Sequence, residues 1–316
     1  MRALVWFLLF PALAAAQAYP EKPIRLIVPY AAGGPTDLMG RMIGEKLTAA
    51  WGQPVIVENR VGAGGNLGTH LVAQASPDGH TLAITGVSAL AVNVTLFPSL
   101  PYDPRRDFTA ITKVVDIPTV LVVPDASPAR SVHELMDLAR RNPGKLNFAS
   151  PTSGTINHLL GETLRTRYGL DIVHVPFKGN PQATESLLRG DVQLMFDNLS
   201  SSLPHLRAGK LRALGVTGPR RVPGLPEVPT MSELGFPGFE GTAWFAIVGP
   251  RGLPAAIASK LNAEIVRILR KPQFAERVER FGMQVAPSSE REMAALIEAD
   301  IVRWGELIRA SGAKAD

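Results

Sequence analysis

The sequence predicts an α/β protein with two lobes, each with its own sheet, around a shared cleft. Short apolar runs alternate with helical patterns along most of the chain, which is typical of strands joined by crossover helices in largely parallel sheets. A glycine-rich turn between an apolar run and a helix start occurs twice in the first part of the chain and twice in the middle. Such a duplicated device favours two lobes over one continuous sheet.

The individual elements follow from these patterns in chain order. The apolar runs, punctuated by Pro and Gly, predict strands at residues 24–28, 55–58, 81–85, 120–123, 146–149, 172–175, 192–196, 211–216 and 244–248. Helical patterns predict helices at residues 36–50, 66–75, 132–141, 157–167, 181–188, 255–270 and 290–309. In the last helix, the apolar residues recur at helical spacing and are more typical of core packing than of a ligand surface.

The chain begins with the features of a secretory signal peptide. A short basic start, Met1-Arg2, precedes an apolar stretch from Ala3 to Ala16, and Ala16-Gln17-Ala18 provides an A-x-A cleavage site. The apolar stretch is shorter than the roughly 20 residues that a membrane-spanning helix needs. With no cysteine beside the cleavage site, a lipid anchor is not expected. We therefore expect residues 1–18 to be removed and the mature protein to reside in the periplasm.

The composition excludes several classes of protein. The chain of 316 residues contains no cysteine, which excludes disulfides, thiol catalysis and cysteine-ligated zinc. Its formal net charge is +5 and its aromatic content is 6%, but the basic residues are scattered, so nucleic acid is not an expected partner. The histidines are dispersed without metal-ligand spacing. We predict neither a metal nor a cofactor.

The first two glycine turns predict an anion site. Glycine permits tight turns with positive φ and close approach of a ligand to the main chain, and the helix that follows presents unpaired N–H groups. In the first turn, we favour the backbone at Gly34 and Thr36 over the Asp37 side chain as the carboxylate contact. In the second turn, Asn66 either contacts the ligand or caps the helix.

The second turn, at residues 62–68, is similar to a dinucleotide-binding loop, but two features argue against that interpretation. Its spacing is not G-x-G-x-x-G, and no acidic residue closes a strand about 20 residues further on. A nicotinamide cofactor is also unexpected outside the cytoplasm. The main-chain N–H groups of this turn are therefore expected to hold a carboxylate directly.

The middle of the chain supplies hydroxyls and charges. Thr152, Ser153 and Thr155 lie beside a helix start with His158 in its first turn. A serine near a histidine raises a hydrolase hypothesis, but no G-x-S-x-G motif is present, so pocket lining or helix capping is expected instead. Lys178 either binds a second carboxylate or forms a surface ion pair.

Asp197 closes a predicted strand at the edge of the cleft. It either fixes a loop or selects ligands that carry an amine. The sequence leaves both interpretations open.

A set of motifs across nearly the whole mature chain resembles the extracytoplasmic solute receptors of the tripartite tricarboxylate transporter type, the Bug family. The matching segments are VPYAAGGPTD (28–37), ENRVGAGGNLG (58–68), SPDGHTL (76–82), SGT (153–155) with His158, HVPFKG (174–179), GKLRAL (209–214), VPT (228–230) and ELG (233–235). One residue departs from the family pattern: Pro35 removes an N–H group from the first turn.

The resemblance implies a two-lobed type II periplasmic-binding-protein fold with the ligand in the interlobe cleft. Lobe I would comprise residues 19–122 and 223–316, and lobe II residues 123–222. One ligand carboxylate would be held mainly by main-chain groups and ordered water, and more variable loops would set selectivity. The implied ligand-binding residues are Tyr30, Ala32, Gly34, Thr36, Asp37, Gly65, Asn66, Ser88, Thr152, Ser153, Thr155, His158, Lys178 and Asp197.

The function implied is that of a monomeric, non-enzymatic solute-binding protein, which closes around a small carboxylate and presents it to the membrane subunits of a transporter. A sensor role, with a membrane kinase as partner, is the first alternative. A periplasmic hydrolase that uses Ser153 and His158 is the second. A dicarboxylate, a tricarboxylate, an amino acid and an aromatic acid are all compatible ligands.

Overall fold

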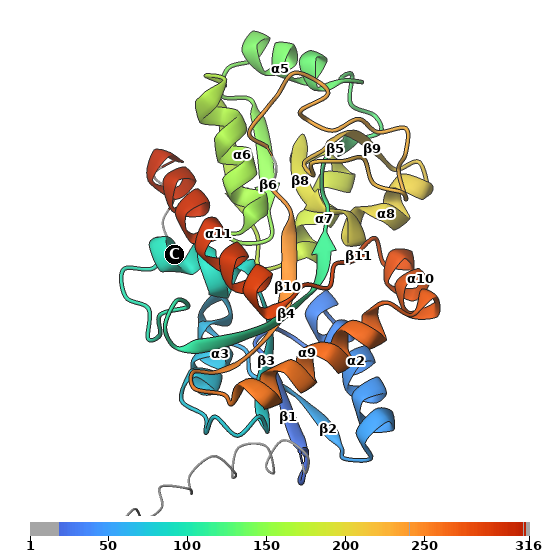
Figure 1. Cartoon of the computed structure of the whole chain (residues 1–316). Coiled ribbons are helices and arrows are strands. Elements are labelled where there is room, and N and C mark those ends of the chain that lie inside the picture. Colours follow the sequence, from blue (N-terminus) through green and yellow to red (C-terminus); the bar gives the residue numbers. More distant parts are fainter. Residues whose placement is uncertain (1–18, 240, 312, 314–316) are drawn as a thin grey trace, which may run out of the picture.

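Two mixed sheets, one in each half of the molecule, organise the fold (Figure 1). The computed structural model describes residues 19–239, 241–311 and 313, so the predicted signal peptide lies outside the described residues. The lower sheet in the view has the strand order β11-β4-β10-β3-β1-β2, and the upper sheet has the order β7-β6-β8-β5-β9.

The lower sheet combines three parallel strands with three strands that pair in antiparallel fashion. Its strands are β1 (Ile24–Val28), β2 (Val55–Asn59), β3 (Thr81–Gly86), β4 (Phe108–Ile117), β10 (Ala243–Pro250) and β11 (Gln284–Val285). β1 lies parallel to β2 and to β3, whereas β10 runs antiparallel to both β3 and β4.

The upper sheet has the same design. Its strands are β5 (Thr119–Pro124), β6 (Leu146–Ser150), β7 (Ile172–Pro176), β8 (Leu194–Asn198) and β9 (Leu211–Val216). β6 lies parallel to β7 and β8, and β5 runs antiparallel to β8 and β9. The expectation of largely parallel sheets is therefore wrong. β5 and β10 enter from the other half of the molecule without the crossover helix that a parallel connection needs.

Helices cover the faces of both sheets (Figure 1). They are α2 (Pro35–Trp51), η1 (Ala63–Gly65), α3 (Asn66–Ala73), η2 (Ser88–Val92), α4 (Asn93–Leu96), α5 (Val132–Arg141), α6 (Ile156–Arg167), α7 (Asn180–Arg189), α8 (Leu199–Arg207), α9 (Ala255–Leu269), α10 (Pro272–Arg280) and α11 (Glu290–Ser311). The sequence-based prediction missed β4, β11, η1, η2, α4, α8 and α10.

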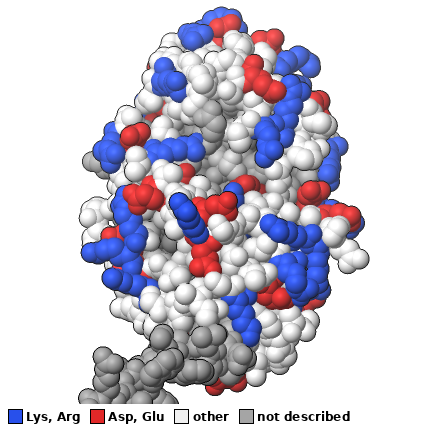
Figure 2. All heavy atoms as spheres, viewed as in Figure 1, with Lys and Arg blue, Asp and Glu red and all other residues white. Residues whose placement is uncertain are grey.

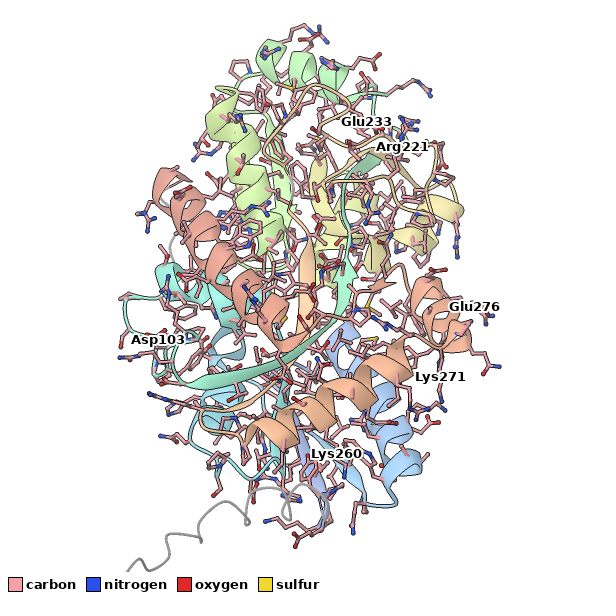
Figure 3. The ribbon with its side chains drawn as sticks, viewed as in Figure 1. Asp103, Arg221, Glu233, Lys260, Lys271 and Glu276 are labelled. Carbon is pink, nitrogen blue, oxygen red and sulfur yellow. The ribbon has the colours of Figure 1, made fainter. Side chains whose placement is uncertain are left out.

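The chain crosses between the two halves at two segments that lie next to each other. The first crossing is Pro118, between β4 and β5, and the second is the return segment 217–242, between β9 and β10. The Thr217 N–H donates to Thr119 O at 2.9 Å, and the Thr217 hydroxyl lies 2.7 Å from Gly241 O. The return segment is also held by the ion pair between Arg221 and Glu233, whose side chains lie together in Figure 3.

These crossings bear on the expected lobe boundaries. Sheet membership changes at Pro118, whereas the expected boundary between residues 122 and 123 falls inside β5. The expected boundary between residues 222 and 223 lies in the return segment. We propose lobe boundaries with the first one moved to Pro118, because a strand belongs with the sheet that it pairs in.

One buried apolar cluster continues from one sheet to the other. It includes Ile27 of the lower sheet, Phe148 of the upper sheet and Trp304 of α11. α11 lies along the side of both halves, next to η2 and α4 and also next to α6 (Figure 1). Its Asp300 accepts a hydrogen bond from Trp244 Nε1 at 2.6 Å. The last helix thus packs into the core, as its apolar stripe predicts.

Candidate functional site

Six loops gather at the facing edges of the two sheets. β1, β2 and β3 are parallel, so their carboxyl ends lie at one edge of the lower sheet; the same holds for β6, β7 and β8 in the upper sheet. The carboxyl edge of a parallel sheet is where α/β proteins bind ligands. The edges face each other, because Gly154 in the loop after β6 packs against Leu96 of α4.

The first glycine turn is organised by a buried carboxylate. Asp37 Oδ2 accepts hydrogen bonds from Gly33 N–H and from Arg41 Nε, both at 2.9 Å, and Asp37 Oδ1 accepts from Asn59 Nδ2 at 2.9 Å. Burial alone would raise the pKa of Asp37, but these bonds and the Arg41 charge together lower it. Both oxygens are occupied, so Asp37 holds the turn in shape. Sequence reasoning missed Asn59.

The start of α2 leaves main-chain donors available. Its N-cap residue, Gly34, provides no side-chain cap, and Pro35 occupies the first turn. Among the described residues, the amides of Thr36 and Asp37 have no hydrogen-bond acceptor. A helix N-terminus with free N–H groups is a binding site for an anion. Of the two favoured backbone positions, Thr36 keeps a free amide, whereas the Gly34 N–H donates to Ala31 O at 3.4 Å. Ala32 lies exposed in the same turn.

The second glycine turn is held close to the first by Tyr30. Gly65 has a φ of +95°, and a Cβ atom at this position would lie 3.0 Å from the Tyr30 ring. Only glycine satisfies both conditions without strain. The Gly65 amide bonds back to Gly62 O at 3.0 Å. Gly65 therefore lets the turn lie close to the Tyr30 ring, while its own N–H is not available to a ligand.

A buried polar cluster lies beneath this turn. Asn66 Oδ1 accepts hydrogen bonds from Asn93 Nδ2 at 2.6 Å and from the Tyr102 hydroxyl at 2.9 Å. The helix-capping interpretation of Asn66 is wrong, because α3 has Gly65 at its N-cap and no side-chain cap. Ser88, the first residue of η2, is half-buried and precedes Ala89, whose carbonyl bonds to Tyr102. No local sequence pattern could have shown that Asn93 and Tyr102 bond to Asn66, because both lie far from it in the sequence.

In the upper half, the loop 151–155 is fixed by hydrogen bonds within the lobe. Thr155 is the N-cap of α6, where its Oγ1 accepts from His158 N at 3.4 Å and donates to Thr152 O at 2.9 Å. The Ser150 hydroxyl also lies 3.0 Å from Thr152 O. Thr155 therefore caps the helix, one of the two roles expected, while Ser153 stays half-buried beside it.

His158 is committed to holding this loop. Its Nδ1 accepts the Gly154 N–H at 2.9 Å, its Nε2 lies 3.8 Å from Glu162 Oε1, and its ring stacks on His174 with centroids 3.9 Å apart. Neither ring nitrogen is directed at Ser153. A hydrolase needs its serine within hydrogen-bond reach of a base, so this geometry does not favour a Ser153–His158 pair.

Asp197 and Lys178 occupy opposite environments. Asp197 is buried: its Oδ1 accepts from Asn180 Nδ2 and Asn198 N, both at 2.8 Å, and its Oδ2 accepts from Ser202. Burial raises the pKa of Asp197 to about 6. Asp197 therefore fixes the β8–α8 loop, as one interpretation expected. Lys178 is exposed after β7, and no ion pair joins it to any described residue.

One face of the molecule carries both signs of charge. In Figure 2, Lys and Arg are interspersed with Asp and Glu over the face in view. A cavity of about 320 Å³ lies between α8 and α10, but its lining contains none of the predicted ligand-binding residues. Within the described residues, no helix has the length and apolarity to cross a membrane.

Comparison with known proteins identifies the family. The family described as "Tripartite tricarboxylate transporter family receptor" matches residues 39–313. The chain belongs to this receptor family. The expected resemblance is thereby confirmed, and so is the two-lobed binding-protein architecture that it implied. BugT from Bordetella pertussis is 37% identical over 301 residues, which cover 95% of this chain and 92% of BugT.

Two solved structures are similar to the chain over their whole length. R. palustris Rpa4515 with adipate has a TM-score of 0.86 and 33% identity, and covers 94% of this chain and 100% of its own. MatC (Rpa3494) from Rhodopseudomonas palustris with bound malate has a TM-score of 0.81 and 33% identity, and covers 92% and 100%.

Proposed function

We propose that this receptor captures a small dicarboxylate between its two lobes in the periplasm and delivers it to the membrane subunits of a transporter. The observation that carries the proposal is the start of α2, whose Thr36 and Asp37 amides have no acceptor among the described residues at the edge where the lobes meet. The adipate and malate bound by the two similar proteins support this ligand class.

The first carboxylate would bind at the start of α2. Oriented N–H groups and the positive end of the helix dipole favour an anion there. The negative charge of Asp37 would work against this, but Arg41 at 2.9 Å from Asp37 Oδ2 compensates that charge. Asp37 thus fixes the shape of the turn, and the turn can still attract an anion.

The second carboxylate would meet the loops of the upper lobe. Lys178 is the cation without a described ion-pair partner in these loops, and the Thr152 and Ser153 hydroxyls lie in the same group of loops. An amine-bearing ligand is less favoured, because the oxygens of both candidate acids, Asp37 and Asp197, already accept hydrogen bonds. This ranks a dicarboxylate above an amino acid.

The ligand would act by stabilising the closed arrangement of the lobes. Contacts to both lobes bind the closed form more tightly than the open form, which shifts the population toward closure. The chain passes between the sheets at Pro118 and in the return segment 217–242, and these two crossings form the natural hinge. A sensor kinase as the recipient of the closed form remains an alternative for the partner.

A thermal-shift screen of the mature chain from Tyr19 tests the proposal. Adipate, malate, their diamides and glutamate would be compared after unfolding and refolding, which removes retained ligand. A dicarboxylate at 100 times its Kd should stabilise the fold by about 2.7 kcal/mol, and its diamide should give no shift. A response to glutamate alone would refute the ranking of ligands. No response to any acid would contradict the carboxylate site itself.

A further inference from the structure

We propose that the short helix α4 positions both sides of the cleft and sets their separation in the closed form. Asn93, at its start, fixes the second glycine turn of the lower lobe. Leu96, at its end, packs against the loop 152–155 of the upper lobe. The inference rests on the proposed function in one respect: these two loops are taken to contact the ligand.

Asn93 connects α4 to the glycine turn through two acceptors. Its Nδ2 donates to Asn66 Oδ1 at 2.6 Å and lies 3.4 Å from Gly64 O. Asn93 is 2% exposed and Asn66 is 3% exposed, so a lost bond would leave a buried polar group unsatisfied. The Tyr102 hydroxyl reinforces the connection, because it bonds both Asn66 Oδ1 and Ala89 O of η2.

Leu96 connects α4 to the upper lobe by close packing. Gly154 is buried with a φ of +78°, and a Cβ atom there would overlap Leu96 Cδ2 and lie 3.1 Å from Leu96 Cγ. The same loop is held from behind, since the Gly154 N–H donates to His158 Nδ1. The contact therefore joins two parts that are each fixed within their own lobe.

The spacing of these contacts makes α4 a rigid spacer. Asn93 and Leu96 are three residues apart, so they are neighbours on one helical turn. α4 is itself packed against η2 and against α11, which also contacts α6. Closure then stops where the loop 152–155 meets Leu96, and the distance left between the two lobes selects the length of the ligand.

The test uses two glycines with the same positive φ of +78°. Gly154→Ala adds a methyl group that collides with Leu96 on closure. Gly190→Ala is the matched control, because Gly190 also lies in the upper lobe but has nothing within 4 Å of the added Cβ. Both variants place a Cβ atom at this φ, and Leu96→Ala combined with Gly154→Ala removes the collision.

The separation of the lobes is measured in the ligand-free protein by double electron–electron resonance between two spin labels. The chain has no cysteine, so spin labels at Leu71→Cys on α3 and Val173→Cys on β7, both exposed in the native protein, report one distance. We expect Gly154→Ala to move the distribution toward longer distances, Gly190→Ala to leave it unchanged, and Leu96→Ala to reverse the effect of Gly154→Ala.

Affinity for adipate and malate is measured on the same variants. Gly154→Ala should weaken binding by about tenfold or more, because the competent closed form is less populated. Equal distance distributions in Gly154→Ala and Gly190→Ala would overturn the inference, as would failure of Leu96→Ala to reverse the effect. If the parent protein bound neither acid, the proposed function would fail, while the ligand-free distances would still decide the role of α4.

Discussion

Two buried carboxylates near the cleft show how differently similar side chains are used. Asp37 faces the cation Arg41 and the amide of Asn59, and the pKa of Asp37 is lowered. Asp197 is surrounded by neutral donors, and its pKa is raised to about 6 by burial. The presence of a charged partner decides the direction of the pKa shift, because hydrogen bonds from neutral groups only partly offset the loss of solvation.

Asp197 predicts a pH dependence of stability. Its folded pKa of about 6 exceeds the ordinary value of 3.8, so the stability that it contributes is full below that ordinary value and is lost as pH rises through 6. Asp197→Asn keeps the shape without the charge. We expect the free energy of unfolding of this variant, relative to that of the wild type, to increase by roughly 2–3 kcal/mol from pH 4 to pH 7.

Urea unfolding of both proteins at several pH values measures this difference. The comparison is informative because Ser202 can accept from the new amide as it donates to the carboxylate now. A difference that stays constant with pH would show that Asp197 titrates in the folded protein as it does in the unfolded chain.

At the scale of elements, the start of α2 is where local sequence and function meet. Pro35 presets the first helical turn but has no N–H group. Pro272 occupies the same position in α10, whose start shares a pocket with Met42 and Lys46, farther along α2. Both helices therefore begin alike, and only one of them begins at the cleft.

Pro35→Ala should strengthen dicarboxylate binding. It adds one N–H donor to the anion site, and a hydrogen bond to a charged group contributes about 1.5–3 kcal/mol, so we expect an affinity gain of about tenfold. Pro272→Ala is the control, because it makes the same change in the unfolded chain without touching the cleft. Calorimetric titration with malate measures both, and equal affinities in the two variants would contradict an anion site at α2.

At the scale of the whole molecule, closure depends on how the two crossing segments are joined. Thr217 is buried, and its hydroxyl bonds to Thr119 O at the start of β5 and to Gly241 O near the end of the return segment. These contacts hold the two ends of the return segment together beside the start of β5.

Thr217→Val should loosen this arrangement. The loss of the hydroxyl leaves a buried carbonyl unsatisfied and costs about 1–3 kcal/mol of stability, and we expect a broader distribution of lobe separations without ligand. Thr109→Val also removes a hydroxyl bond, to Pro250 O at 3.1 Å, but within the lower sheet. The same label pair on α3 and β7 measures both variants. A narrow distribution in Thr217→Val would show that the hinge does not depend on this residue.

Much of the fold was readable because its signals are local. The strands at 24–28 and 211–216 and the helix at 132–141 have the predicted bounds, since apolar periodicity and capping residues are written in consecutive residues. The prediction missed β4, where Lys113 and Asp116 interrupt the apolar pattern and pair with each other. It missed α8, which contains Pro204. α10 carried a usable signal, because Phe274 and Val278 lie four residues apart on its buried face.

The sequence by itself determined the α/β class, the positions of the glycine turns and the family, because these depend on the local conformational needs of glycine and on ordered motifs. Only the tertiary structure decided which polar groups are already used. Each of these three side chains, of Asn66, Asp37 and Asp197, accepts at least one hydrogen bond from a residue distant in sequence. The amides of Thr36 and Asp37, in contrast, have no acceptor among the described residues. The contact between Leu96 and Gly154 likewise joins residues from different lobes. Such pairings depend on how the chain folds back on itself, and no local pattern of residues specifies them.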